Sequence, residues 1–199
     1  MNRLLLIMLV TFAISARGGI DLTPSASEYT AQGVTFRQLS FKDGKRLVVY
    51  ELPRQWGYQG GGTSLQLSPP SPLRADASIQ VADIAKPQPF DETLFAALKE
   101  QSLRSVPPGA QNPTLVNEEL NPIRLERGDV YGVTISYQAL GETFLRSTLY
   151  VNLSDAQLTF RLTARKADFE KLQRAFRSSI LSWHWVEPAP SAAPLTASK

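Results

Sequence analysis

The feature that most constrains this sequence is a long alternation of apolar and polar residues between positions 131 and 162. Successive side chains of a β-strand point to opposite faces of the sheet, so this period predicts strands with one buried face. Turn-forming residues at 140–142 and 152–155 separate the strands, which predicts an antiparallel meander. The buried positions are Tyr131, Val133, Ile135 and Tyr137, then Leu145, Leu149 and Val151, and then Leu158, Phe160 and Leu162.

Two amphipathic helices are predicted beside this meander. The apolar residues Phe169, Leu172, Phe176 and Ile180 recur at spacings of three and four, while charged residues take the opposite side. Asp168 is the predicted N-cap of this helix. A second helix is predicted over residues 91–106, between Asp91 as its N-cap and the helix-stopping sequence Pro107-Pro108-Gly109.

The other strands precede the first helix or close the domain. Residues 34–41 and 46–52 flank an Asp43-Gly44 pair, which is a strong hairpin signal. Residues 64–67 and 78–84 predict short strands, and residues 182–186 predict a final strand. The predicted fold class is therefore α+β: an antiparallel meander sheet with an N-terminal hairpin and two main helices packed on it.

The length of 199 residues and the composition of the ends predict one domain. Residues 1–16 read as a secretory signal peptide, because Arg3 precedes an apolar run, residues 4–14, that is too short to span a membrane. Residues 17–33 are predicted to be a flexible lead-in, 34–186 the domain, and 187–199 a disordered tail rich in Pro, Ala and Ser. We expect an exported protein, periplasmic or secreted. Retention of the signal as an anchor stays open.

Composition excludes several classes of function. The chain has no cysteine and one histidine, His184, which excludes disulfide frameworks, thiol catalysis and His-pair metal centres. We therefore predict no metal and no cofactor. The net charge is only +3 and the basic residues are interspersed with acidic ones, so nucleic-acid binding is not expected. The expected partner is an envelope protein or component of unknown identity, bound by a monomer.

The order of these elements resembles the PsbP-like fold. The resemblance is carried by Pro53-Arg54-Gln55-Trp56 after the second strand, the helix at 91–106, the meander from 129 to 164, and the last helix running into Ser182-Trp183. It covers nearly the whole domain and implies an α/β/α sandwich in a bacterial exported protein distantly similar to DcrB-type envelope proteins. What such proteins share is binding, so the resemblance implies no catalytic residue. The lack of cysteine departs from the lipoprotein branch.

Two groups of residues are candidate binding sites. Trp56 and Tyr58 precede Gly60-Gly61-Gly62, which lacks the lysine of a phosphate-binding loop and is predicted to be a flexible turn. The two aromatic residues would give this loop an adaptable contact surface. Arg146 and Arg161 fall on the polar faces of adjacent predicted strands. They could receive an anion there, or simply belong to a solvated sheet face.

The leading hypothesis is a non-enzymatic binding or assembly domain that uses the loop at 56–62 and a neighbouring sheet surface. An envelope hydrolase is the first alternative, using either His184, which lies between Trp183 and Trp185, or a pair of carboxylates. The acidic candidates are Glu118, Glu119, Glu126, Asp129 and Glu142. A carrier of a small apolar ligand, held between helix and sheet, is the second alternative.

Overall fold

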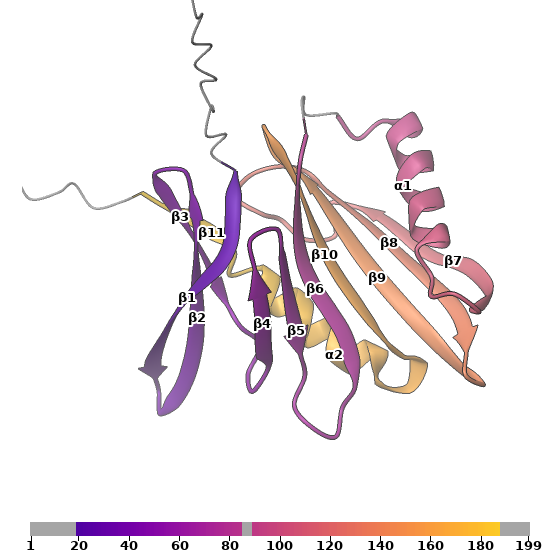
Figure 1. Cartoon of the computed structure of the whole chain (residues 1–199), viewed down its shortest axis with the longest axis horizontal. Coiled ribbons are helices and arrows are strands. Elements are labelled where there is room, and N and C mark those ends of the chain that lie inside the picture. The colour runs from indigo at the N-terminus through magenta and orange to yellow at the C-terminus, as the bar shows by residue number, and fades with distance from the viewer. Residues whose placement is uncertain (1–18, 85–88, 188–199) are drawn as a thin grey trace, which may run out of the picture.

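The structure is a computed structural model that describes residues 19–84 and 89–187. The predicted signal peptide at 1–16 and all but the first residue of the predicted tail at 187–199 lie outside these residues. The described part forms two antiparallel sheets and two helices (Figure 1).

The strands are shared between a four-stranded and a seven-stranded sheet. The smaller sheet has the order β1 (Ile20–Ala31), β2 (Val34–Asp43), β3 (Arg46–Glu51) and β11 (His184–Val186). The larger one has the order β4 (Gly57–Gly61), β5 (Ser64–Ser68), β6 (Ala75–Asp83), β10 (Ala156–Arg165), β9 (Glu142–Asn152), β8 (Val130–Ala139) and β7 (Gln111–Leu120). The predicted meander is thus the run β8–β9–β10 in the larger sheet.

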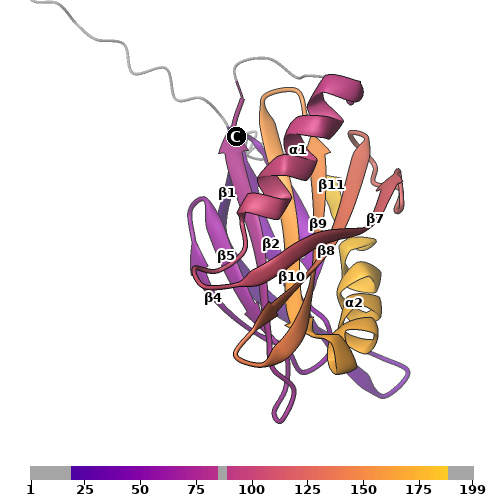
Figure 2. The same cartoon turned by 90° about the vertical axis from the view of Figure 1, so that its right-hand side faces the viewer.

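The two helices cover opposite faces of the larger sheet (Figure 2). On β9, the neighbouring residues Leu149 and Tyr150 point to opposite sides and belong to different apolar clusters. Tyr150 lies in the cluster under α1 (Glu92–Arg104), and Leu149 lies in the one that contains α2 (Lys166–Ile180). This arrangement confirms the predicted antiparallel α+β fold with helices packed on the sheet.

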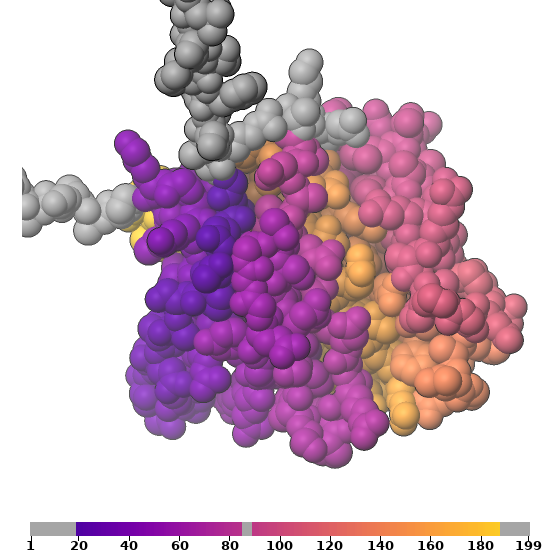
Figure 3. Space-filling model, viewed as in Figure 1, coloured from indigo at the N-terminus to yellow at the C-terminus, as the bar shows by residue number. Residues whose placement is uncertain are grey.

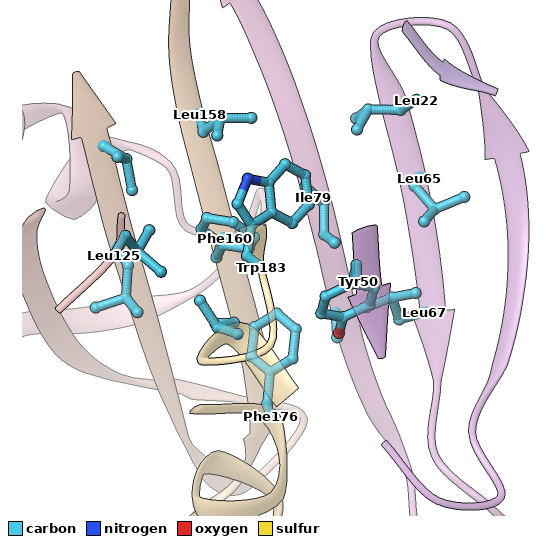
Figure 4. Packing of buried hydrophobic residues seen from close by; sticks show 14 of the residues in the cluster. Leu22, Tyr50, Leu65, Leu67, Ile79, Leu125, Leu158, Phe160, Phe176 and Trp183 are labelled. Carbon is cyan, nitrogen blue, oxygen red and sulfur yellow. The ribbon is translucent and has the colours of Figure 1, made fainter. Parts of the chain in front are cut away.

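The main core lies where α2 and the two sheets meet (Figure 4). Its centre is Trp183, which is 1% exposed. The indole stacks on Phe41 of β2 at 5.6 Å between ring centroids and meets Phe160 of β10 edge-on at 5.3 Å. Trp185 is also buried, whereas His184 between the two tryptophans is exposed, as their alternation predicted. The aromatic cluster therefore joins the smaller sheet to the larger one.

Two local predictions are corrected by the structure. Residues 20–31, predicted to belong to a flexible lead-in, form strand β1, whose partner is β2. Leu22 is fully buried in the main core, so the ordered body begins before residue 34. Helix α2 begins at Lys166, its N-cap is Arg165 without a side-chain hydrogen bond, and Asp168 lies in the first turn. An acidic residue there still stabilises the positive end of the helix dipole.

Candidate functional site

A half-open groove of about 430 Å³ lies beside the segment that links β3 to β4. The link turns at Pro53, where the carbonyl accepts a hydrogen bond from the Trp56 amide at 3.0 Å. Gln55 takes a φ of 63°, a left-handed conformation that favours glycine. The tight turn carries the chain from the smaller sheet to the larger one and leaves Arg54 and Gln55 exposed at the groove.

The opposite wall of the groove is the hairpin β1–β2, which extends beyond the rest of the smaller sheet in Figure 1. Phe36 faces Tyr29 across the hairpin, with stacked rings 5.2 Å apart. The Tyr29 hydroxyl donates to Glu51 at 2.7 Å and so ties the hairpin to β3. The full lining is Glu28, Thr35, Phe36, Arg37, Leu52, Pro53, Arg54, Gln55, Trp56 and Gly57.

The charges in the groove do not cancel. Arg37 forms an ion pair with Glu28 at 2.8 Å, both being partly exposed. Arg54 forms no ion pair within 4 Å with any residue the structure describes. The groove therefore combines apolar surface from Phe36 with one free positive charge, which suits a ligand that carries both an apolar and an acidic group.

The structure corrects the predicted contact loop at 56–62. Trp56 is 4% exposed and stacks on Phe176 of α2 with ring centroids 6.0 Å apart, so its indole belongs to the core. Tyr58 is half-buried against the same core. The residues between Gly57 and Ser68 form the hairpin β4–β5 instead of a pliant loop. Of the predicted contact loop only Trp56 and Gly57 line the groove, and the exposed residues Arg54 and Gln55 beside them were not among the predicted site residues.

The three glycines at the end of this hairpin have a structural explanation. Gly60 and Gly62 adopt φ values of 102° and 64°, which the turn requires and side-chain-bearing residues rarely adopt. A Cβ on Gly61 would lie 3.0 Å from Oγ1 of Thr23, because β1 crosses close to this turn. The Gly62 amide also donates to that oxygen at 3.0 Å. Backbone geometry and close packing therefore account for Gly60-Gly61-Gly62.

The two predicted arginines lie together, but only one is on an open face. Arg146 on β9 is 5% exposed, because the C-terminal end of α1 covers it. Its guanidinium donates to Oγ1 of Thr163 at 2.8 Å, to Oγ of Ser105 at 3.0 Å, and to the carbonyl of Ser105. It also lies 5.5 Å from the ring centroid of Tyr137. Arg146 is therefore not on a solvated sheet face, as one reading of the sequence predicted, but under a helix end.

Arg161 on β10 lies on the same face as Arg146. In the sheet register Arg161 is opposite Thr148 of β9 and Ser78 of β6, and Arg146 is opposite Thr163 of β10. The Nε atom of Arg161 is buried and has no hydrogen-bond acceptor. The rest of the side chain is half-buried.

The two neighbouring positive charges and their burial shift pKa values on this face. Burial lowers the pKa of Arg146, and the nearby charge of Arg161 lowers it further, whereas Tyr137 and Asp76 act in the opposite direction. Burial also raises the pKa of Tyr150, which donates to or accepts from Ser102 of α1 at 3.0 Å. The face under α1 is thus a polar cluster that holds two cations, and the carboxylate of Asp76 lies close enough to act on Arg146.

The residues proposed for hydrolysis lie apart from the groove lining and from the arginine pair. His184 is exposed, and its Nδ1 lies 2.7 Å from the carbonyl oxygen of Ser182. Each carboxylate candidate has its own partner in the structure. Three form ion pairs: Glu118 with Lys99, Glu119 with Arg177, and Glu142 with Arg165. Two accept hydrogen bonds: Glu126 from the Trp185 amide, and Asp129 from the Asn121 side chain. Their contacts stabilise the fold.

Among residues 19–84 and 89–187, no group of three or more His, Cys, Asp or Glu residues could hold a metal ion. Neither helix of the described chain is long and apolar enough to cross a membrane.

Similar proteins are found by structure but not by sequence. No protein-family model matches the chain, and no curated protein matches it. Its solved structural neighbours include cyanobacterial PsbP from Synechocystis, with a TM-score of 0.49, 15% identity, and coverage of 80% of this chain and 92% of that one.

Two other neighbours have similar scores. Protein PA94 of unknown function from Pseudomonas aeruginosa has a TM-score of 0.44 at 15% identity, covering 83% of this chain and 99% of that one. LpqN, involved in cell envelope biogenesis of Mycobacterium tuberculosis, has a TM-score of 0.43 at 13% identity, covering 82% and 91%. Likeness at this level concerns the fold and says nothing of a shared ligand or partner.

Proposed function

We propose that this protein is an exported, non-enzymatic binding or assembly domain that contacts an envelope protein or component through the groove between hairpin β1–β2 and residues 52–57. The observation that carries this proposal is the groove itself, about 430 Å³ in volume and open to solvent on one side. That volume falls in the range of roughly 300–1,000 Å³ typical of ligand sites. Export rests on the signal-like sequence at 1–16.

The chemistry of the lining indicates what fits. Phe36, which is half-buried on the hairpin, offers apolar contact, and Thr35 beside it is exposed, with its hydroxyl 3.3 Å from that of Thr30. Arg54 offers a planar, permanently charged donor that pairs well with carboxylates. The preferred occupant is an exposed loop or extended segment of a partner that places an apolar side chain in the groove and an acidic one against Arg54.

A site-specific photo-cross-linker tests this assignment in the intact protein in its native envelope. We place the probe at Thr35 on the groove wall and, as a matched control, at exposed Ser178 on α2. The proposal predicts a discrete adduct from Thr35 that is absent from Ser178. Equal labelling from both positions, or none from Thr35, would contradict it.

Charge variants sharpen the test. Arg54→Glu should reduce the Thr35 adduct by about tenfold or more, since it replaces attraction with repulsion for an acidic partner. Arg124→Glu is the control, because Arg124 is equally exposed and lies outside the groove. If both variants reduce the adduct to the same extent, the effect comes from net charge and the groove is not the contact site.

A further inference from the structure

The seven-stranded sheet carries a second polar site, independent of the groove, around Arg161. Arg146 and Arg161 project from neighbouring strands on the face that α1 partly covers. No carboxylate lies within 4 Å of either guanidinium among the residues that the structure describes. Asp76, opposite Thr163 on β6, acts on Arg146 through space without forming an ion pair. Two cations thus share a partly buried face, and the carboxylate of Asp76 acts on Arg146 there without pairing with it.

The hydrogen bonds indicate different roles for the two arginines. Arg146 is held by Thr163 and by the Ser105 carbonyl and hydroxyl at the C-terminal end of α1, where a cation is stabilised by the helix dipole. It is therefore a positioning residue that docks α1 and adds positive potential. Arg161 has no such partner: its Nε–H is buried and donates to no acceptor.

An unsatisfied buried guanidinium N–H is unusual, because leaving a buried donor without an acceptor is costly. The groups around Arg161 place further hydrogen-bonding atoms next to this N–H. Ser78 and Thr148 flank it in the register, and both are buried hydroxyls that can donate as well as accept. Figure 3 shows that β10, in orange, is open to solvent between β6 and α1.

We propose that Arg161, flanked by Ser78 and Thr148 and backed by the charge of Arg146, binds an oxyanion group of a ligand, either a carboxylate or a phosphate. Both anions accept paired hydrogen bonds from the planar guanidinium. The rest of the ligand lies over β5 and β6, where Gln66 is opposite Ser78 and Ser64 is opposite Gln80. These uncharged side chains form hydrogen bonds with hydroxyl or amide groups, so the ligand is polar along its length.

NMR of the arginine Nε–H groups tests this proposal directly in the intact protein. Inorganic phosphate and acetate are titrated separately as probes of the two anion types. We expect a saturable shift of the Arg161 Nε–H resonance with at least one probe, with a dissociation constant on the order of 1–10 mM for so small an ion. The probe that saturates at the lower concentration identifies the anion class. Absence of a saturable shift with both probes overturns the proposal.

Variants separate the site from general charge effects. Arg161→Gln should weaken binding of the preferred probe by about tenfold or more, and Arg161→Lys should retain part of it, because it keeps the charge but loses the planar fork. Arg124→Gln is the control and should bind like wild type. Equal binding by Arg161→Gln and wild type, followed through backbone amide shifts near Ser78, refutes the site. The Arg161 Nε–H resonance and the amide shifts near Ser78 report only on this site, because neither residue lines the groove, so this test stands apart from that of the groove.

Discussion

The buried phenol of Tyr50 should make the protein lose stability in alkaline solution. Tyr50 lies on β3, is fully buried, and shares a hydrogen bond of 2.8 Å with Ser179 of α2. Burial raises the pKa of Tyr50 far above its ordinary value of 10.0, while the hydrogen bond with Ser179 opposes this slightly. The folded protein therefore keeps this proton at pH values where the unfolded chain has released it.

The sign and size of the effect follow from proton linkage. Above pH 10 the unfolded state binds fewer protons than the folded state, so the free energy of unfolding falls as pH rises. For one tyrosine that stays protonated in the fold, the loss between pH 8 and pH 11 is about 1.4 kcal/mol. Tyr50→Phe removes this contribution, and it removes one hydrogen bond worth about 1 kcal/mol at pH 8.

Urea unfolding followed by tryptophan fluorescence measures both effects. Tyr50→Phe should be less stable than wild type by about 1 kcal/mol at pH 8 and equally or slightly more stable at pH 11. Ser179→Ala is the matched control: it loses the same hydrogen bond but keeps the buried phenol, so its deficit should persist at pH 11. A difference between wild type and Tyr50→Phe that is the same at both pH values would refute the reasoning.

Three further substitutions test the packing, a turn and a helix cap by the same unfolding assay. Leu172→Ala removes a side chain that is 2% exposed in the main core, and should cost about 2–5 kcal/mol; a cost below 1 kcal/mol would mean that α2 is not packed as described. Gly128→Ala should cost more than about 1 kcal/mol, because φ is 80° and the new Cβ would collide with the carbonyl oxygen of Asn152. Asp91→Ala removes the side chain that accepts from the Leu94 amide at 2.9 Å and should cost about 1 kcal/mol, with Asp91→Asn retaining most of the stability.

Local sequence patterns predicted most of the strands and both helices, but not that β8 and β9 are buried on both faces of the sheet, one face under α1 and the other in the core that contains α2. The alternation at 131–162 became β8, β9 and β10, and the spacing of Phe169, Leu172 and Phe176 became the buried face of α2. What these patterns could not indicate is which strands share a sheet. The division into two sheets depends on long-range pairing, such as that of β11 with β3, which leaves no local signal.

Strand β1 was predicted to be part of a flexible segment, and its composition explains why. Residues 25–31 are mostly exposed and carry Ser, Glu and Thr, so the period-two signal of a half-buried strand is absent. Pairing with β2 and the burial of Ile20 and Leu22 at its beginning hold the strand in place instead. A polar composition predicted a flexible segment because the sequence alone does not reveal that a neighbouring strand supplies the hydrogen bonds.

In the candidate sites too, local sequence does not reveal which side chains are buried and which face a groove. Trp56 was predicted to face a partner because it adjoins glycines, but its stacking on Phe176 depends on a helix that begins 110 residues later in the chain. The exposed neighbour Arg54 carries no pattern that distinguishes it from other surface arginines. Its importance comes only from the hairpin β1–β2, which forms the second wall of the groove.

Arg146 and Arg161 also show that the role of a side chain depends on residues distant in the sequence, because their own sequence contexts are similar. Each follows an apolar residue on a strand of the meander, Leu145 or Phe160, and each faces the same side of the sheet. Their hydrogen bonds separate them: the Ser105 carbonyl at the C-terminal end of α1 accepts from Arg146, whereas the Nε–H of Arg161 has no acceptor. Arg146 therefore has a structural role at the helix end, whereas the buried Nε–H of Arg161, which has no acceptor, is the observation on which the proposed anion site rests. Since the groove and the Arg161 site share no residue, an anion bound on the sheet should not displace a partner bound at the groove.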